Sequence, residues 1–146
     1  MRHRLSRLRL RYKPHHSRAL QRNLITSLFL YEAVRTTKKR AEVVQPQVEH
    51  LLTVAKTKEP HIAIRAINAV VTHKNASRKI MEVLRLRFED RTSGFTRIVP
   101  LGSRAGDGAK VVSLQLVEGK EVKVAEKKKA VQRTKKTPKK VPSKKS

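Results

Sequence analysis

The spacing of apolar and polar residues predicts a first helix that joins a charged segment to a packed body. Leucine and tyrosine recur three or four positions apart at 20, 24, 28 and 31, so they share one face of a helix. Arg18 and Arg22 lie one turn apart on the opposite side, and Ile25 and Phe29 follow them. We therefore expect the first half of this helix to face a polyanion and the second half to be buried. Ser17 is the predicted N-cap.

The residues that follow predict a short strand and three more helices. Residues 33–37 contain β-branched side chains, which indicate a strand. Thr37 is placed to cap a helix over residues 38–56, in which Pro46 should cause a kink or a restart. Pro60 suits the first turn of a helix over residues 61–73, and Asn75 should cap a helix over residues 76–88. The apolar residues expected to be buried on these three helices are Ala41, Val44, Val48, Leu51, Leu52, Ala55, Ile64, Ile67, Val71, Ile80, Val83, Leu84 and Phe88.

Two later segments predict a β-hairpin. Residues 94–101 and 110–117 have strand composition and enclose a glycine-containing loop. Val112, Leu114 and Leu116 alternate with Val111, Ser113 and Gln115, so each set should occupy one face. Pro100 cannot donate to a ladder, so the first of these strands is an edge strand there or ends at that point. With residues 33–37 as a third strand, we predict an α+β fold of about four helices packed on a small three-stranded mixed sheet.

The net charge is the strongest compositional signal. Lysine and arginine number 36 against 11 acidic residues, which makes the chain +25. Residues 1–23 hold eight basic residues and no acid, residues 24–118 hold sixteen against nine, and residues 119–146 hold twelve against two. The excess charge therefore lies at the two ends of the chain. A polyanionic partner is the simplest explanation, with nucleic acid favoured over an anionic membrane.

These charge differences divide the chain into three predicted parts. Residues 1–16 alternate arginine with leucine and should form a basic, extended N-terminal arm, for which a solvated tail is the alternative. Residues 17–118 should form a single α/β globular domain. Residues 119–146 are of low complexity and rich in lysine, which predicts a disordered tail. A solubilising extension and a second RNA-binding arm are equally good explanations of that tail.

Several other classes of protein fit the sequence poorly. The absence of cysteine excludes a disulfide framework and a thiolate metal site. No apolar run approaches the length of a membrane span, and no apolar segment of a secretory signal follows the first basic residues. The arginine-rich opening does have the composition of an organellar transit peptide, which is an alternative to the RNA-binding arm.

No catalytic or cofactor site stands out. The loop over residues 102–110 lacks the glycine spacing and the following helix of a nucleotide-binding loop, so we expect its glycines to supply positive φ in a wide turn. The six histidines have no metal-ligand spacing with a cysteine or an acid. Glu32, Glu42 and Glu49 are interpreted as helix-surface charges. We therefore predict no enzyme activity, no cofactor, no metal and no small-molecule substrate.

The few aromatic residues form no stacking platform, so recognition should depend on phosphate contacts and shape rather than on bases. A nucleoid protein and a ribosomal protein both satisfy that description. Short blocks along residues 1–118 then distinguish the two. They are MRHR (1–4), ALQRNL (19–24), SL (27–28), EAVRTT (32–37), RAE (40–42), LLTVAK (51–56), RF (87–88), GFTRI (94–98) and RAGD (104–107). Their order and spacing closely resemble the bacterial-type family of large-subunit ribosomal protein seventeen.

This resemblance implies a structural constituent of the large ribosomal subunit that binds large-subunit ribosomal RNA near the exit of the peptide tunnel. It also implies neighbours among large-subunit proteins, with protein thirty-two among them. The ribosome would be cytoplasmic or that of an organelle, and the N-terminal arm would belong to the mature protein. Where the family has a His-Arg pair, this chain has His16-Ser17-Arg18, and the tail beyond residue 119 lies outside the common pattern. A chromosome-associated DNA-binding protein is the runner-up, and a nuclease is third.

The residues that we predict to bind RNA are the basic and polar groups of the arm, the first helix, the second helix and the hairpin. They are Arg2, His3, Arg4, Arg7, Arg9, Arg11, Lys13, His16, Arg18, Arg22, Asn23, Thr37, Arg40, Arg97, Arg104 and Lys110.

Overall fold

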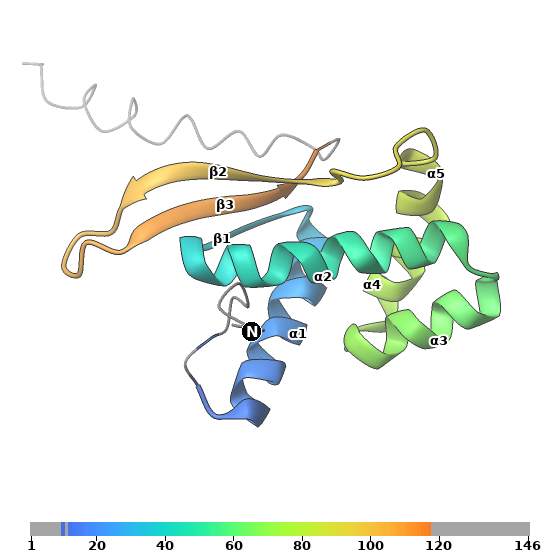
Figure 1. The fold of residues 1–146 in the computed structure, drawn as a ribbon, viewed down its shortest axis with the longest axis horizontal. Coiled ribbons are helices and arrows are strands. Elements are labelled where there is room, and N and C mark those ends of the chain that lie inside the picture. The colour runs from blue at the N-terminus through green and yellow to red at the C-terminus, as the bar shows by residue number, and fades with distance from the viewer. Residues whose placement is uncertain (1–9, 11, 118–146) are drawn as a thin grey trace, which may run out of the picture.

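The computed structural model describes residues 10 and 12–117 (Figure 1). Its elements follow in the order α1 (Pro14–Tyr31), β1 (Ala33–Thr37), α2 (Lys38–Thr57), α3 (Pro60–Val70), α4 (Lys74–Lys79), the π-helical segment η1 (Ile80–Leu84), α5 (Arg85–Arg87), β2 (Thr96–Ser103) and β3 (Lys110–Leu116). The predicted α+β fold, with helices beside a three-stranded sheet, is confirmed. The predicted arm residues before residue 10, residue 11 and the predicted tail lie outside the described residues.

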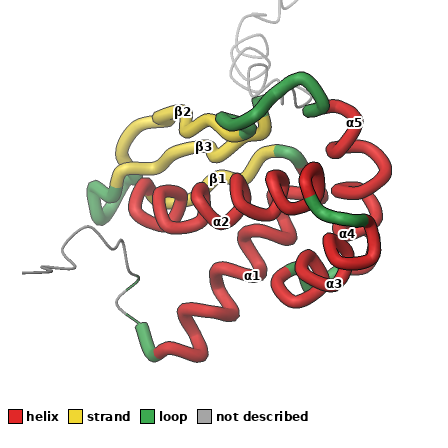
Figure 2. The backbone as a smooth tube through the Cα atoms, turned by 45° about the vertical axis from the view of Figure 1, so that its right-hand side comes forward, coloured by secondary structure: helices red, strands yellow, loops and turns green. Residues whose placement is uncertain are grey.

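The sheet is antiparallel throughout, and not mixed as we predicted. Its strand order is β1-β3-β2, so the hairpin partner β3 is central and β2 is an edge strand, as Pro100 indicated. Helices α1 and α2 lie against one face of this sheet, with α2 running beneath it and α1 crossing below (Figures 1 and 2). Val112, Leu114 and Leu116 point into that layer and are buried, as the alternation predicted. A bulge between Pro100 and Gly102 lets β2 continue beyond the proline.

Helix α1 begins four residues earlier than predicted. Pro14 occupies its first turn and Lys13 is the N-cap, because proline lacks only an N–H that would have no helical partner there. The Ser17 hydroxyl therefore does not cap the helix and instead accepts from Gln21 Nε2 at 3.1 Å. The second half of the helix is buried through Ile25, Leu28 and Phe29, as expected. Tyr31, however, is 71% exposed at the last position, beyond the edge of the core.

Helix α2 is the long element on which the core is built. All six of its predicted core residues are buried. The helix passes through Pro46 without a restart, since Pro46 is exposed and the missing N–H removes a bond on the solvent side. Thr37 is the N-cap residue, as predicted, but its side chain makes no capping hydrogen bond.

The helices between α2 and the hairpin depart from the predicted pattern at three positions. On α3, Ile67 is buried with Ala63, whereas Ile64 is 43% exposed. The cap of α4 is His73, whose Nδ1 accepts the N–H of Asn75 at 3.2 Å, and not Asn75 itself. The wide π turn of η1 then shifts the helical register, so that positions 80, 84 and 88 face the core and Val83 is 42% exposed.

Two glutamates that we interpreted as surface charges instead connect separate elements. Glu32 is buried, adopts a left-handed conformation (φ 63°) and pairs with Lys79 at 2.7 Å and Arg87 at 3.0 Å. Glu49 of α2 accepts from the Phe95 N–H at 3.0 Å, the Thr96 N–H at 2.9 Å and the Thr96 hydroxyl at 2.6 Å. Only Glu42 remains a surface charge, 3.8 Å from Lys38. These contacts hold α1, α4 and the start of β2 in place around the core.

Candidate nucleic-acid interface

Some basic side chains of the described residues lie where three elements come together, while others, such as Arg65 of α3 and Arg78 of α4, lie elsewhere. The first turns of α1 and α2 and the turn between β2 and β3 lie on the same side of the molecule in Figures 1 and 2. The C-terminal end of α2, with α3, η1 and α5, lies on the other side. The fold therefore brings the first turns of α1 and α2 and the β2–β3 turn, which are far apart in sequence, to one side of the domain.

The first basic group lies where residues 10–18 meet α2. Leu10 is buried, and the Tyr12 hydroxyl accepts from Arg40 Nη2 at 3.1 Å. The ring of His16 meets Tyr12 edge-on at 5.1 Å between centroids. Arg18 and Lys13 are exposed beside them. The end of the predicted arm is thus attached to the domain, and it presents predicted RNA-binding residues from a fixed backbone.

Arg22 and Asn23 continue this surface along α1. Both are exposed, but Arg22 Nε donates to the backbone carbonyl of Val70 at 3.0 Å. That carbonyl belongs to the end of α3, where the helix dipole favours a cation. Arg22 therefore has a structural contact in addition to its predicted contact with RNA.

The second basic group surrounds the first turn of α2. Thr37, Lys38, Lys39 and Glu42 line a hollow of about 360 Å³ together with Lys110 from β3. Helix α2 has no acidic residue in its first turn, so its N–H groups and these lysines leave a positive potential there. We predicted Thr37 and Lys110 as site residues but missed Lys38 and Lys39. Their signal in the sequence was a run of three cations directly after a strand.

The third basic group lies on the sheet face that points away from the helices. Arg35 pairs in register with Ser113, and Arg97 with Gln115, so both arginines project from the face opposite Leu114. Both are exposed, and no acidic residue occupies this face within the described strands. Arg97 was predicted and Arg35 was missed, because only the strand pairing shows that they share a face.

Arg104 at the hairpin turn has an acidic partner. Its Nε donates to Asp107 Oδ1 at 2.9 Å, its Nη2 donates to Asp107 Oδ2, and Asp107 also accepts the Ala109 N–H at 3.2 Å. The hydrogen bond from Arg104 is the main cause that lowers the pKa of Asp107 to about 2. Gly106 and Gly108 have positive φ, as predicted for a wide turn. Arg104 therefore organises this loop, whatever else it contacts.

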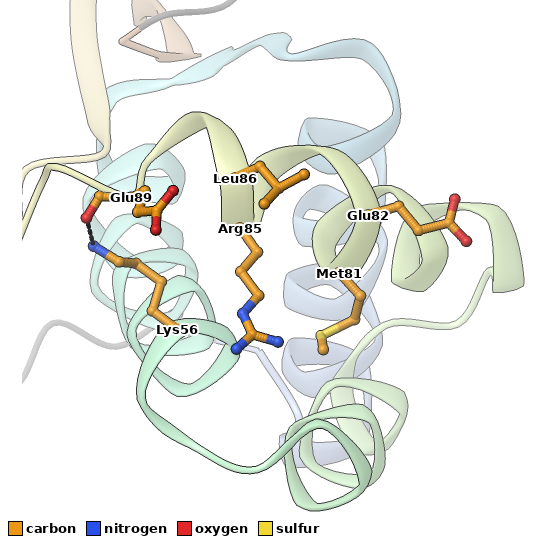
Figure 3. A pocket seen from close by; sticks show the side chains of 6 residues that line it. All are labelled: Lys56, Met81, Glu82, Arg85, Leu86 and Glu89. Carbon is orange, nitrogen blue, oxygen red and sulfur yellow. Dashed lines mark hydrogen bonds between the residues drawn. The ribbon is translucent and has the colours of Figure 1, made fainter.

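A separate hollow of about 480 Å³ lies on the other side of the domain (Figure 3). It is lined by Lys56, Met81, Glu82, Arg85, Leu86 and Glu89. Lys56 Nζ donates to the backbone carbonyl of Glu89 at 3.0 Å, while the Glu82 and Glu89 carboxylates lie on opposite sides of Leu86 and Arg85 (Figure 3). This arrangement does not bring two carboxylates together as acid–base hydrolysis requires.

A membrane-spanning helix and a metal site are two further possibilities for the described part of the chain. None of its helices combines the length and apolar character that crossing a membrane requires. Between residues 12 and 117, no three or more histidine or acidic side chains come together in a way that could hold a metal ion. The predicted site residues Arg2, His3, Arg4, Arg7, Arg9 and Arg11 lie outside the described residues.

Comparison with known proteins identifies the family. Residues 20–117 match the family model described as ribosomal protein L17. The protein named large ribosomal subunit protein bL17 in Chloroflexus aggregans is 37% identical over 117 residues, which cover 80% of this chain and all of the relative. Its namesake in Solibacter usitatus is 39% identical over 86% of this chain and 83% of the relative. A third, in Endomicrobium trichonymphae, is 42% identical over 70% of this chain and 86% of the relative.

These matches confirm the resemblance that the sequence blocks indicated. The residues that the family model matches include the helices and strands that carry the second and third basic groups. The chain belongs to the ribosomal protein L17 family and is a structural ribosomal protein, not an enzyme.

Proposed function

We propose that this chain is a structural constituent of the large ribosomal subunit and binds large-subunit ribosomal RNA through backbone phosphates, stabilising the folded RNA. The observation that carries the proposal is the clustering of cations that have no carboxylate partner among the described residues. They are Lys13 and Arg18 of the first group, Lys39 and Lys110 of the second, and Arg35 and Arg97 of the third. Such a surface repels itself unless a polyanion neutralises it.

The distribution of acids supports the orientation of the bound RNA. Glu59, Glu82, Glu89 and Asp90 are exposed, and all belong to the side of the domain that carries the end of α2, η1 and α5. RNA placed there would meet these carboxylates, whereas the sheet face with Arg35 and Arg97 has none among the described strands. We therefore propose that RNA covers the starts of α1 and α2 and the outer face of the sheet.

The three-part organisation also belongs to this proposal. Residues 1–16 act as a basic arm that enters folded RNA, residues 17–118 form the globular domain, and residues 119–146 form a lysine-rich tail. The last three arm residues are already part of α1, so the arm is continuous with the helix that carries Arg18 and Arg22. The arm residues Arg2, His3, Arg4, Arg7, Arg9 and Arg11 would add phosphate contacts to the three groups.

Protein neighbours and location follow from the same proposal. Neighbouring large-subunit proteins, with protein thirty-two among them, would contact the surfaces that RNA leaves uncovered. The exposed side around η1 and α5 is the part of the described domain best suited to such a neighbour, because it carries both acids and the apolar Leu86, which is 68% exposed. The chain would work in the cytoplasm, or in an organelle whose ribosome is of bacterial type.

The salt dependence of RNA binding tests the proposed function. Each neutralised phosphate should contribute about −0.7 to −0.9 to the slope of log affinity against log salt concentration. We expect a steep negative slope for large-subunit ribosomal RNA, measured by filter binding with the full chain. A slope near zero would refute the phosphate mechanism. Co-sedimentation with large subunits after treatment with a nuclease for DNA alone distinguishes this function from DNA binding.

A further inference from the structure

Two hollows meet at the first turn of α2, and they differ in chemical character. One is the hollow of about 360 Å³ around Thr37, Lys38, Lys39 and Lys110 described above. The other has a volume of about 450 Å³ and is mainly apolar, and its lining includes Ile98, Pro100 and Val112 together with Ser103. Lys38 and Lys110 line both hollows, so they stand at the border between them.

The apolar hollow exists because the hairpin extends beyond the layer of helices. Ile98 pairs with Leu114 and Pro100 with Val112, so they belong to the sheet face that the helices cover. Helix α2 starts at Lys38, directly after β1 ends, while β2 and β3 continue past that point toward their turn (Figure 1). Ile98 is consequently only half-buried and Pro100 is exposed. The last part of the covered face thus has no helix of the described chain over it.

The cationic hollow beside it is not neutralised by the described chain. Glu42 is its one acidic lining residue, and that carboxylate lies 3.8 Å from Lys38. Lys39 and Lys110 are exposed and have no carboxylate partner among the described residues. The Thr37 side chain makes no capping hydrogen bond to the first N–H groups of α2. An anion placed here would meet two unpaired ammonium groups and the positive end of a 20-residue helix.

We propose that the two hollows together seat one unstacked nucleotide of RNA. The base lies over Ile98 and Pro100 in the apolar hollow, and its phosphate lies among Lys38, Lys39 and Lys110. This inference rests on the proposed function, and it adds a base contact to recognition that the sequence indicated would depend on phosphates alone. The volume of the apolar hollow is within the usual range for small-ligand sites, which are mostly apolar with a few polar groups.

Because an apolar hollow lies beside a cationic one, a nucleotide fits the two together better than a simpler ligand does. Inorganic phosphate would satisfy the lysines but leave the apolar surface open to water. An apolar side chain of another protein would fill that surface but leave the lysines without an anion. Among the described residues, no aromatic side chain lines either hollow, and the only hydroxyl of the apolar one is that of Ser103. The site should therefore accept any base, with sequence-tolerant contacts rather than an edge-specific code.

Short RNA probes test the inference directly. The full chain, labelled for NMR at backbone amides and at isoleucine and valine methyl groups, is titrated with a tetranucleotide of adenosines and with an abasic tetranucleotide of the same charge. We expect the adenosine probe to shift the Ile98 and Val112 methyl signals together with the Lys38 and Lys39 amides. The abasic probe should shift the amides and leave the methyl signals in place.

Three results would overturn the inference. Equal effects of the two probes, confined to the amides, would reduce the site to a phosphate contact. If neither probe shifts signals in either hollow while large-subunit ribosomal RNA still binds, the nucleotide site is refuted and the proposed function remains intact. Larger methyl shifts with a hexaglutamate peptide than with the adenosine probe would assign the site to an acidic protein chain. Loss of ribosomal RNA binding by the native chain itself would refute the proposed function instead.

Matched variants give an independent measurement. Pro100→Glu places a carboxylate in the apolar hollow, while Leu101→Glu adds the same charge one residue away at an exposed position that lines neither hollow. We expect Pro100→Glu to weaken binding of the adenosine probe by roughly tenfold and Leu101→Glu by no more than about threefold, because only residue 100 would lie against the base in the proposed site. Equal losses of affinity for the adenosine probe in the two variants would contradict the proposed nucleotide site. Thermal unfolding followed by circular dichroism establishes that both remain folded.

Lysine variants test the proposed phosphate contact through the salt dependence of probe binding. Lys38→Ala at the start of α2 should reduce the salt slope for the adenosine probe by about 0.7, the value for one phosphate of single-stranded RNA. Lys58→Ala follows the other end of the same helix and should leave the slope unchanged. An unchanged slope for Lys38→Ala would remove that lysine from the site.

Discussion

Glu32 and Lys79 form an ion pair beneath the surface that joins the end of α1 to the end of α4, with Glu32 Oε1 2.7 Å from Lys79 Nζ. The side chains are 8% and 24% exposed, and Arg87 approaches the other carboxylate oxygen at 3.0 Å. Lys79 Nζ also donates to the Leu30 carbonyl at 3.0 Å, and the Glu32 carbonyl accepts the Leu116 N–H at 2.9 Å. One residue in a left-handed conformation thus connects two helical segments with the central strand.

Glu32→Gln should destabilise the fold by about 1–3 kcal/mol, because two partly buried cations lose their shared carboxylate. The free energy of unfolding, measured by urea denaturation, checks this value. Glu82→Gln is the control, since the Glu82–Arg78 pair is exposed at 3.7 Å and its loss should cost less than about 0.5 kcal/mol. If the two variants were equally stable, the Glu32 cluster would have no special role in the fold.

Replacing both Arg35 and Arg97 with alanine should weaken ribosomal RNA binding without affecting stability. Both side chains are exposed on the outer face of the sheet, so little packing is lost. The salt slope should fall in magnitude by about 1.4–1.8, the contribution of two phosphates. Arg65→Ala on the exposed face of α3 removes a comparable side chain and should not change the slope. An unaltered slope in the double variant would exclude the sheet face from the interface.

Truncations on either side of residue 10 should distinguish residues that only bind RNA from residues that also stabilise the fold. Removing residues 1–9 takes away four arginines and should reduce the salt slope by up to about 3.6, with little change in melting temperature. Removing residues 1–16 also deletes the buried Leu10, Tyr12 and the first turn of α1, and should lower the melting temperature as well. Calorimetry of the two truncated chains measures the difference. Equal melting temperatures would mean that residues 10–16 do not stabilise the domain.

Acid should open the hairpin turn only as the pH falls to about 2. The pKa of Asp107 is lowered to about 2 because the carboxylate accepts from Arg104, so the charged form stabilises the folded turn. That stabilisation is complete above about pH 4 and is lost as pH falls through about 2. NMR titration of the Ala109 amide, which donates to Asp107, should show this midpoint. In Asp107→Asn the transition should be absent, and a midpoint near pH 4 in the native chain would contradict the Arg104 contact.

Features of this fold that depend on neighbouring residues could be predicted from the sequence, whereas features that depend on distant residues could not. The periodicity located the helices and strands, because the free energy of burying one face acts on residues a few positions apart. It failed on α4 and η1, where a π turn changes the period itself and turns Val83 outward. It also placed the helix cap at Ser17, because hydroxyl caps are common, whereas Pro14 already set the backbone for a helix.

The sequence by itself determined the excess of positive charge, the order of the elements and the family, since these depend on composition, short-range pattern and shared blocks of residues. Only the tertiary structure decided which charges are available to RNA. It paired Arg104 with Asp107, buried Glu32 between Lys79 and Arg87, and brought Lys38 beside Lys110. The physical reason is chain closure: most of these contacts join residues about 50 or more positions apart, and they form only after the core has fixed the backbone that carries them.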